Sequence, residues 1–200
     1  MNDNVIYLHN RTREPYLQTY SGGRFFPLDV KRSDIAIVDI AHALSNQCRY
    51  GGHCTRFYSV AEHSLLISRE LTRRGYSATV AMAGLLHDAA EAYLVDLPSP
   101  VKKLMPAYCA LEKQVLDHVF HAYYMPMEIP DIVHEYDNRI LLDERAQNMC
   151  YVYYGYGWPE NVSPLNVDLE LYAPAEAAKE FMLRFAALQV ARRKSGELAL

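Results

Sequence analysis

Ionisable residues within apolar helical segments are the feature that most restricts how this chain can fold. The stretch from Ser77 to Leu94 is rich in alanine and other apolar residues, yet it contains His87, Asp88 and Glu91. Three ionisable groups in one apolar segment are costly to bury unless a partner or a metal ion compensates them. The fold must therefore bring a compensating group to this segment.

Helix signals dominate the chain. Apolar periodicity, capping residues and prolines predict helices over residues 39–45, 59–74, 77–94, 107–123, 130–150 and 174–193. The sequence around Ser21-Gly22-Gly23 also predicts a short N-terminal β-hairpin, because glycine supplies the turn. We expect one all-α domain over residues 1–200. Its motif core lies at about 34–150, and an aromatic loop and a C-terminal helix follow in 151–200.

Particular residues are expected to begin these helices. Ser59 and Glu62 have the spacing of a capping box, Ser77 is expected to cap the helix that follows it, and Pro130 fits the first position of its helix. Asp34 or Asp39 is expected to cap the first helix.

The composition is that of an ordinary globular protein, with 50% hydrophobic residues, 22% charged residues and a net charge of −4. This balance gives no overall attraction to nucleic acid or to anionic membranes. No apolar run has the length of a membrane span, and the N-terminus lacks a signal-peptide pattern. The four cysteines show no CxxC spacing and are expected to be reduced thiols. We expect a cytoplasmic protein without a nucleic-acid or membrane partner.

Two other predicted helices also place an ionisable residue on an apolar face. His63 shares a face with positions 60, 67 and 71, and Asp137 shares one with positions 133 and 140 and with Glu144. Each residue has a simpler explanation by itself. His63 could be a hydrogen-bonded core residue, and Asp137 could cap its helix or pair with Arg139 or Arg145.

The adjacent pair His87-Asp88 is harder to explain in this way. Neighbouring side chains on a helix diverge by about 100°, but both can still reach one ion at the helix face. Together with His63 and Asp137 they provide two imidazoles and two carboxylates. Such a mixed nitrogen and oxygen set suits a catalytic transition metal with open positions better than a closed structural zinc site.

The order His63, His87-Asp88, Asp137 resembles the H…HD…D signature of the HD-domain phosphohydrolases. The surrounding sequence is similar to the 5′-deoxynucleotidase branch typified by YfbR, and phage dATP triphosphohydrolases of the DatZ type are near relatives of that branch. The similar runs are SVAEHS (59–64), LHDAAE (86–91) and DLPSPVK (96–102). The resemblance covers roughly residues 34–150.

The resemblance implies a single HD-domain helical bundle around one divalent ion. His63, His87, Asp88 and Asp137 would be its ligands, and manganese, cobalt, zinc or iron would be the metal. A second divalent ion that enters with the substrate phosphates is an open alternative. When bound, the metal would lower the pKa of a water molecule and polarise a phosphoryl oxygen.

The resemblance also implies catalytic roles for Glu91 and Asp96. Glu91 would orient or deprotonate the water, or protonate the leaving oxygen. The alternatives are that Glu91 accepts a hydrogen bond from a histidine ligand, and that Asp96 caps the turn into Pro98. In the nucleotidase branch an Arg-Trp pair holds the 5′-phosphate, and Arg49-Tyr50 is the nearest match here.

Arg49 suits a phosphate because guanidinium binds it bidentately and stays charged. His53 and Arg56 lie in the following glycine-containing loop, and Lys102 follows two prolines, so all three are further candidates for substrate binding. For each of these cations a position on the solvated surface is the alternative.

Two aromatic or apolar features remain open. The tyrosine-rich stretch from Tyr151 to Trp158 could stack on a nucleobase, cover the pocket, or pack in a core or subunit contact. The last helix has an apolar stripe of Phe181, Phe185 and Leu188, which indicates core or an oligomer interface. On this basis we expect a homo-oligomer, a dimer or larger.

We expect a 5′-(deoxy)nucleotidase that releases phosphate from nucleoside monophosphates. A dNTP triphosphohydrolase is the runner-up, which Lys102, Lys103 and Arg56 would favour because a longer phosphate tail needs more positive charge. Hydrolysis of cyclic nucleotides or guanosine tetraphosphate is less favoured. An alternative of another class is a non-catalytic metal-binding or nucleotide-binding module, against which the intact ligand set and Glu91 argue.

Overall fold

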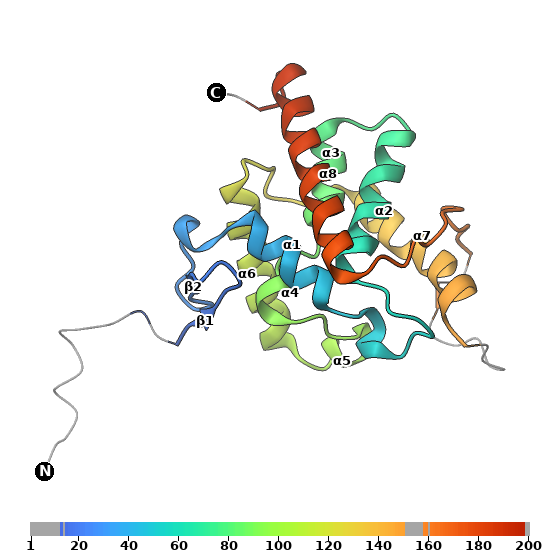
Figure 1. Cartoon of the computed structure of the whole chain (residues 1–200), viewed down its shortest axis with the longest axis horizontal. Coiled ribbons are helices and arrows are strands. Elements are labelled where there is room, and N and C mark those ends of the chain that lie inside the picture. Colours follow the sequence, from blue (N-terminus) through green and yellow to red (C-terminus); the bar gives the residue numbers. More distant parts are fainter. Residues whose placement is uncertain (1–12, 14, 151–157, 160, 199–200) are drawn as a thin grey trace, which may run out of the picture.

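The computed structural model describes residues 13, 15–150, 158, 159 and 161–198 of the chain. Within them the protein is mostly helical, which confirms the expected all-α class (Figure 1). The helices are α1 (Ile37–Asn46), α2 (Val60–Arg73), α3 (Ala78–Leu86), α4 (Glu91–Leu94), α5 (Ser99–Lys102), α6 (Pro106–Ala122), α7 (Asp131–Asn148) and α8 (Pro174–Lys194). Short 3-10 helices, η1 (Arg32–Asp34) and η2 (Arg49–Gly52), precede α1 and α2. No helix among the described residues combines the length and apolarity that crossing a membrane requires.

The predicted N-terminal hairpin is present. Strand β1 (Leu17–Gln18) pairs antiparallel with β2 (Arg24–Phe25). In the turn, Gly22 has a φ of 85°, which glycine adopts without steric cost. Phe25 is fully buried, and its ring stacks on that of Tyr93 with 3.8 Å between centroids. The hairpin is thereby anchored to the helical core.

The N-terminal segment also uses the two aspartates that were expected to cap α1. That prediction is wrong, because Ala36 occupies the N-cap position and no described side chain caps the helix. Asp34 belongs to η1 and pairs with Arg13. Asp39 lies in the first turn of α1 and accepts hydrogen bonds from the main-chain N–H and the hydroxyl of Ser21, at 2.7 and 2.9 Å. Both carboxylates attach the N-terminal segment to the helices.

Helix α2 begins at the predicted cap. The Ser59 hydroxyl accepts a hydrogen bond from the main-chain N–H of Glu62 at 3.1 Å. The Glu62 carboxylate, however, accepts hydrogen bonds from the main-chain N–H groups of Leu171 and Tyr172. Only one half of the predicted capping box is therefore formed, and the other half is replaced by a tie to the segment before α8.

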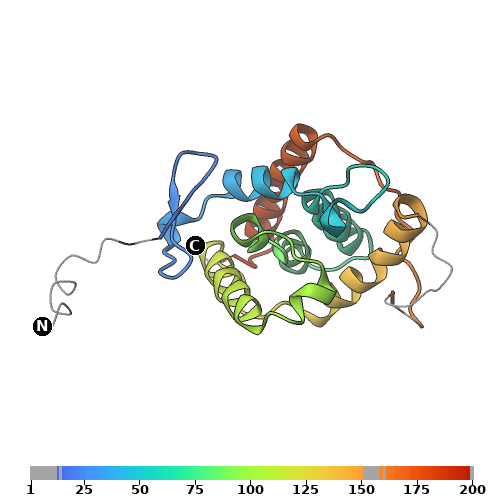
Figure 2. The same cartoon turned by 90° about the horizontal axis from the view of Figure 1, so that it is seen from below.

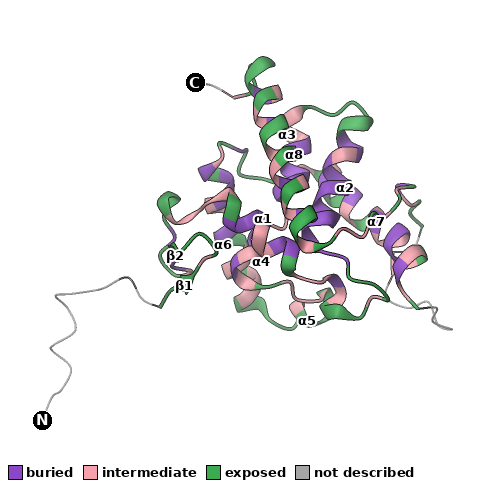
Figure 3. Ribbon diagram, in the orientation of Figure 1, coloured by how far each residue is buried: buried purple, intermediate pink, exposed green. Residues whose placement is uncertain are grey.

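Helices α2 and α3 approach each other closely at Gly84. A Cβ atom at this position would lie 2.6 Å from Leu71 Cδ1 and 3.1 Å from Ile67 Cγ2, so a larger residue would force the helices or side chains to shift. Buried residues gather where α1, α2, α3 and α8 face one another (Figure 3). This core holds α2 and α3 in a fixed relation, and both helices lead into the candidate site.

The helix predicted over residues 77–94 is interrupted. Ser77 caps α3 as expected, but α3 ends at Leu86 and α4 begins at Glu91. Main-chain hydrogen bonds across residues 87–90 span three residues instead of four, so this stretch forms tight turns. His87 and the next residue therefore project from a turn instead of the middle of a helix.

Helices α6 and α7 follow one another along one side of the molecule (Figure 2). Pro130 is the N-cap of α7, and Asp131 is its first residue, one position later than predicted. Helix α8 lies across α1, α2 and α3 (Figure 1). Phe181 and Leu188 of α8 are buried and Phe185 is partly buried. The apolar stripe of α8 therefore packs in the hydrophobic core, and it no longer supports the expectation of an oligomer.

Candidate metal centre

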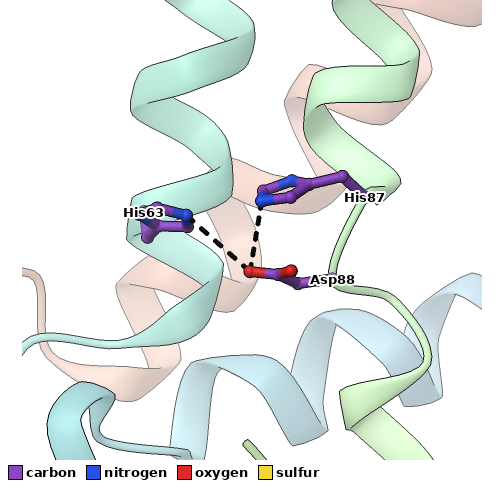
Figure 4. Close-up of side chains that lie close together, drawn as sticks. All are labelled: His63, His87 and Asp88. Carbon is purple, nitrogen blue, oxygen red and sulfur yellow. Dashed lines mark ion pairs between the residues drawn. The ribbon is translucent and has the colours of Figure 1, made fainter. Parts of the chain in front are cut away.

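Three side chains of the kinds that bind metals meet between α2 and the turn after α3. His63 projects from α2, and His87 and Asp88 project from the turn (Figure 4). Each offers one nitrogen or oxygen atom, and these atoms lie within 4.8 Å of one another. Asp88 Oδ2 is 3.7 Å from His63 Nε2 and 3.2 Å from His87 Nε2. These three residues form a candidate metal site.

Asp137 approaches the same point from α7. Its Oδ1 lies 3.0 Å from His63 Nε2 and 3.8 Å from His87 Nε2. The Asp137 side chain is 38% exposed, whereas that of His63 is fully buried. The structure thus brings the four predicted ligands together, three in a compact group and Asp137 at its solvent side. We call these four residues the ligand group.

The hydrogen bonds of the two imidazoles leave their Nε2 atoms available. His87 Nδ1 is 2.9 Å from the carbonyl oxygen of Gly84, and because a carbonyl only accepts, this Nδ1 carries a proton. The Nε2 atoms of His63 and His87 are buried and have no hydrogen-bond partner among the described residues. Buried polar atoms without partners are rare in proteins, and two facing one carboxylate fit a pair of metal ligands.

The charges in this group depend strongly on one another. Burial lowers the pKa of His87, but Asp88 raises it, and the result is well above the ordinary value. Burial raises the pKa of Asp88, but His87 lowers it to about 2. For Asp137 burial again raises the pKa, but the nearby imidazoles of His63 and His87 lower it to well below the ordinary value. Ionised carboxylates therefore favour positive charge at this point, whether a proton or a metal ion supplies it.

Glu144 belongs to the site, although sequence reasoning did not name it as a site residue. Its carboxylate is fully buried, with Oε1 at 2.7 Å from His63 Nδ1 and Oε2 at 3.4 Å from Arg49 Nε. Burial raises the pKa of Glu144, but Arg49 and His63 lower it to below the ordinary value. The signal that could have found Glu144 is its place on α7, two helical turns after Asp137 on the same face.

Arg49 is buried, so the alternative of a solvated surface residue is excluded. Only 9% of its surface is exposed, and its Nη1 lies 3.7 Å from Asp88 Oδ2. Arg49 begins η2, in which Tyr50 and Gly51 have left-handed φ values of 59° and 60°. This turn brings the Tyr50 hydroxyl to the Glu144 carboxylate, to which it donates a hydrogen bond. Arg49 and Tyr50 therefore lie beside the ligand group.

A cavity of about 480 Å³ borders the ligand group, and we call it the main cavity for this position, not for its size. The predicted site residues that line this main cavity are Arg49, Tyr50, His53, Asp88, Glu91, Asp96, Lys102 and Asp137. Trp158 also lines it, with its ring centroid 5.8 Å from that of Tyr50. The remaining aromatic residues of the predicted tyrosine-rich stretch, at 151–157, lie outside the described residues.

Arg56 is the predicted substrate residue that the structure does not bring to the main cavity. It lines a different cavity together with Phe57 and residues 169–174. Its guanidinium donates a hydrogen bond to the carbonyl oxygen of Gln147 at 3.4 Å. The surface alternative therefore describes Arg56 better than a role at the ligand group.

Glu91 and Lys102 face each other in the wall of the main cavity. Glu91 is 4% exposed, and its Oε1 accepts a hydrogen bond from Lys102 Nζ at 3.0 Å. Lys102 also donates to Glu112 at 2.7 Å. The Glu91 Oε2 atom is buried and has no hydrogen-bond partner among the described residues. Burial and the nearby charge of Asp88 raise the pKa of Glu91 well above its ordinary value.

Gln47 positions the two candidate catalytic carboxylates, and sequence reasoning missed it. Its Nε2 donates to the main-chain oxygen of Glu91 at 2.9 Å, and its Oε1 accepts from the main-chain N–H of Asp96 at 2.8 Å. Between them Val95 has a φ of 74°, which a β-branched residue rarely adopts. Burial raises the pKa of Asp96 above its ordinary value. Gln47 thus holds a strained turn that carries both carboxylates to the cavity.

A second cavity of about 260 Å³ reaches the ligand group from the side of α6. Asp88, Glu91, Lys102 and Asp137 line both cavities. The second cavity also contains the side chain of Glu112, so its charged lining includes a further carboxylate. The ligand group is therefore open on two sides, with Glu91 and Lys102 between them.

Comparison with known proteins gives the family. No family model matches the chain. Over 115 residues it is 38% identical to the uncharacterized protein RCAP_rcc00048 of Rhodobacter capsulatus, an alignment that spans 55% of this chain and 59% of that protein. Over 188 residues it is 34% identical to the uncharacterized protein YfdR of Escherichia coli (strain K12), which covers 89% of this chain and 98% of YfdR. The chain therefore belongs to the same family as Escherichia coli YfdR.

Proposed function

We propose that this protein is a metal-dependent phosphohydrolase with an HD-type site, and that its substrates are 5′-(deoxy)nucleoside monophosphates. One observation carries the proposal: the unpartnered Nε2 atoms of His63 and His87 converge on the Asp88 carboxylate next to the main cavity. The order of these residues in the chain agrees with the H…HD…D signature that the sequence resembles.

His63, His87, Asp88 and Asp137 would hold the metal ion. Their nitrogen and oxygen donors suit manganese, cobalt, zinc or iron with coordination positions left open. Bound there, the ion supplies Lewis-acid chemistry, since it polarises a phosphoryl oxygen and makes water more acidic. The protein contributes the position of the ligands and the charged residues around the phosphate.

Arg49 is proposed to bind the phosphate. Its guanidinium stays charged at all physiological pH values and offers several donors in one plane. It lines the main cavity and lies within 3.7 Å of Asp88, so a phosphate that contacts the ligand group also lies near Arg49. Tyr50 and Trp158, which line the same cavity, would provide aromatic surface for the nucleobase.

The charge balance favours a monophosphate over a triphosphate. Of the cations that would favour a longer phosphate tail, Arg56 lines another cavity and Lys102 is shared by two glutamates. Acidic side chains outnumber the basic side chains that line the main cavity. Each additional phosphate of a substrate would bring more negative charge next to these acidic side chains, which is unfavourable. The carboxylates that line the main cavity are Asp88, Glu91, Asp96 and Asp137.

Glu91 is proposed to act as the general acid. Because burial and Asp88 raise its pKa, its carboxyl group keeps a proton at a pH at which an exposed glutamate has lost it. That proton can pass to the leaving oxygen of the nucleoside when the phosphate bond breaks. Asp96 lines the same cavity and is the second acid or base candidate.

The test is a screen for inorganic phosphate with every ribo- and deoxynucleoside mono-, di- and triphosphate, with manganese, cobalt, zinc or iron added. We expect phosphate from the 5′-monophosphates, and none from the Asp88→Ala variant. Phosphate seen only after addition of pyrophosphatase or tripolyphosphatase would indicate a triphosphohydrolase instead. A lack of hydrolysis with every substrate and metal would contradict the proposal and favour a cyclic-nucleotide hydrolase or a non-catalytic binding module.

A further inference from the structure

Glu144 contacts both His63 of the ligand group and Arg49, the residue proposed to bind the phosphate. It is fully buried, and its Oε1 lies 2.7 Å from His63 Nδ1 and accepts a hydrogen bond from the Tyr58 hydroxyl at 2.9 Å. Its Oε2 accepts a hydrogen bond from the Tyr50 hydroxyl and lies 3.4 Å from Arg49 Nε. One carboxylate thus contacts four side chains, two of which belong to the proposed metal and phosphate sites.

The contact with Glu144 fixes which nitrogen of His63 can bind a metal. This carboxylate accepts hydrogen bonds from the hydroxyls of Tyr58 and Tyr50, and the positive charge of Arg49 lies beside it. These neighbours stabilise its ionised form. An ionised carboxylate only accepts hydrogen bonds, so His63 Nδ1 must donate. The lone pair of the neutral imidazole is then on Nε2, the atom that faces Asp88 and Asp137.

The same carboxylate restrains the phosphate side. Arg49 lies between two acidic groups, with Nε at 3.4 Å from Glu144 and Nη1 at 3.7 Å from Asp88. Tyr50 has a left-handed backbone, and its hydroxyl reaches Glu144 from the η2 turn. Removing the Glu144 charge would therefore loosen Arg49 and Tyr50 as well as His63.

We propose that Glu144 is the positioning residue of this site: it holds His63 with Nε2 toward the metal and holds Arg49 toward the phosphate. The effect on Arg49 rests on the proposed function, whereas the effect on His63 requires only that the ligand group binds a metal. Hydrogen bonds of this kind to histidine ligands change metal affinity by roughly 10- to 100-fold when they are removed.

Asp143 provides a matched control on the same helix. It is also a buried carboxylate, 5% exposed, but it accepts hydrogen bonds from the main-chain N–H groups of Leu165, Asn166 and Val167. None of these three partners is a predicted ligand, and none lines the main cavity. Glu144→Gln and Asp143→Asn therefore remove the same charge from neighbouring residues with different partners.

The experiment measures the dissociation constant of Co²⁺ from its visible absorption and by competition with a chelator. For Glu144→Gln we expect a dissociation constant higher by roughly 10- to 100-fold. Asp143→Asn should lower the melting temperature but leave Co²⁺ affinity unchanged. If folded Glu144→Gln binds Co²⁺ as tightly as the wild type, or if Asp143→Asn weakens binding equally, the proposal is overturned.

A measurement on the wild type keeps the proposal testable if Glu144→Gln does not fold. Nitrogen-15 NMR of the histidine rings in the Zn²⁺-bound protein should show His63 protonated at Nδ1 and bound to metal through Nε2. A His63 ring bound through Nδ1 would contradict the proposal. If the wild type binds no metal, this proposal and the proposed function both fail. If it binds Co²⁺ in the manner expected but hydrolyses no nucleotide, only the proposed function fails.

Discussion

Lys102 Nζ donates a hydrogen bond to Glu91 Oε1 at 3.0 Å in the wall between two cavities beside the ligand group. Lys102 is held from the other side by Glu112 at 2.7 Å. Because Lys102 contacts one oxygen of Glu91 only, the other oxygen remains buried without a hydrogen-bond partner among the described residues. This arrangement leaves one carboxyl oxygen of Glu91 free to take part in proton transfer.

A comparison of the two glutamates that bind Lys102 tests this role. Glu91→Gln removes the proposed acid and should lower kcat by roughly 10²- to 10⁴-fold, the usual contribution of a general acid or base. Glu112→Gln removes a similar contact to Lys102 without removing the acid, so its decrease in kcat should be far smaller. Steady-state kinetics of phosphate release would show this difference. Equal losses in both variants would mean that Glu91 acts only by holding Lys102.

Arg49 and Arg56 offer a matched pair for phosphate binding. Arg49→Lys keeps the charge but loses the planar bidentate donor, so KM should rise by on the order of tenfold with a smaller change in kcat. Arg56→Lys should leave KM unchanged, because Arg56 lines another cavity. Initial rates over a range of substrate concentrations separate the two parameters. An equal KM in wild type and Arg49→Lys would exclude Arg49 from the phosphate site.

The effect of a metal on thermal stability should depend on pH. Asp88 raises the pKa of His87 above its ordinary value, so in the metal-free protein the protonated imidazole stabilises the fold below the ordinary pKa. That contribution is lost as the pH rises through the raised pKa. Since a metal ligand must be neutral, a metal displaces this proton at low pH but not at high pH. Manganese should therefore raise the melting temperature more at about pH 8.5 than at about pH 6.

The control for this pH dependence is Asp88→Ala, which should show little metal-induced change in melting temperature at either pH. Differential scanning fluorimetry with and without the metal provides the comparison. A shift in the wild type that is as large at the lower pH as at the higher pH would be incompatible with proton competition at His87.

The contact between α2 and α3 at Gly84 gives a prediction for stability. Gly84→Ala would place a Cβ 2.6 Å from Leu71 Cδ1, so the core must rearrange. We expect a loss of about 1–3 kcal/mol in the free energy of unfolding, reduced in part by the higher helix propensity of alanine. Urea denaturation of the metal-free protein measures this value. Unchanged or increased stability would show that Leu71 adjusts without cost.

Much of the helical architecture could be predicted from local sequence. Ser59 and Ser77 accept hydrogen bonds from the helices that they were expected to cap. The positions of His63 and Asp137 also followed from local periodicity, because residues three or four apart share a helix face. Both side chains do approach the same point.

The break between α3 and α4 could not be predicted in this way. Residues 87–90 contain neither glycine nor proline, and their alanines favour a helix, so local propensity predicts continuation. The contact between His63 and Glu144 joins residues 81 positions apart and depends on how α2 packs against α7. For the same reason the burial of Arg49 and the separation of Arg56 from the main cavity became visible only in the folded chain.

Metal dependence is tested by phosphate release from 5′-deoxynucleoside monophosphates, measured with protein that a chelator has stripped of metal. We predict no release by the stripped wild type, recovery when manganese or cobalt is added, and no recovery in Asp88→Ala. Release that is unaffected by the chelator or by Asp88→Ala, or the absence of release with every metal, would contradict a metal-dependent phosphohydrolase at this site.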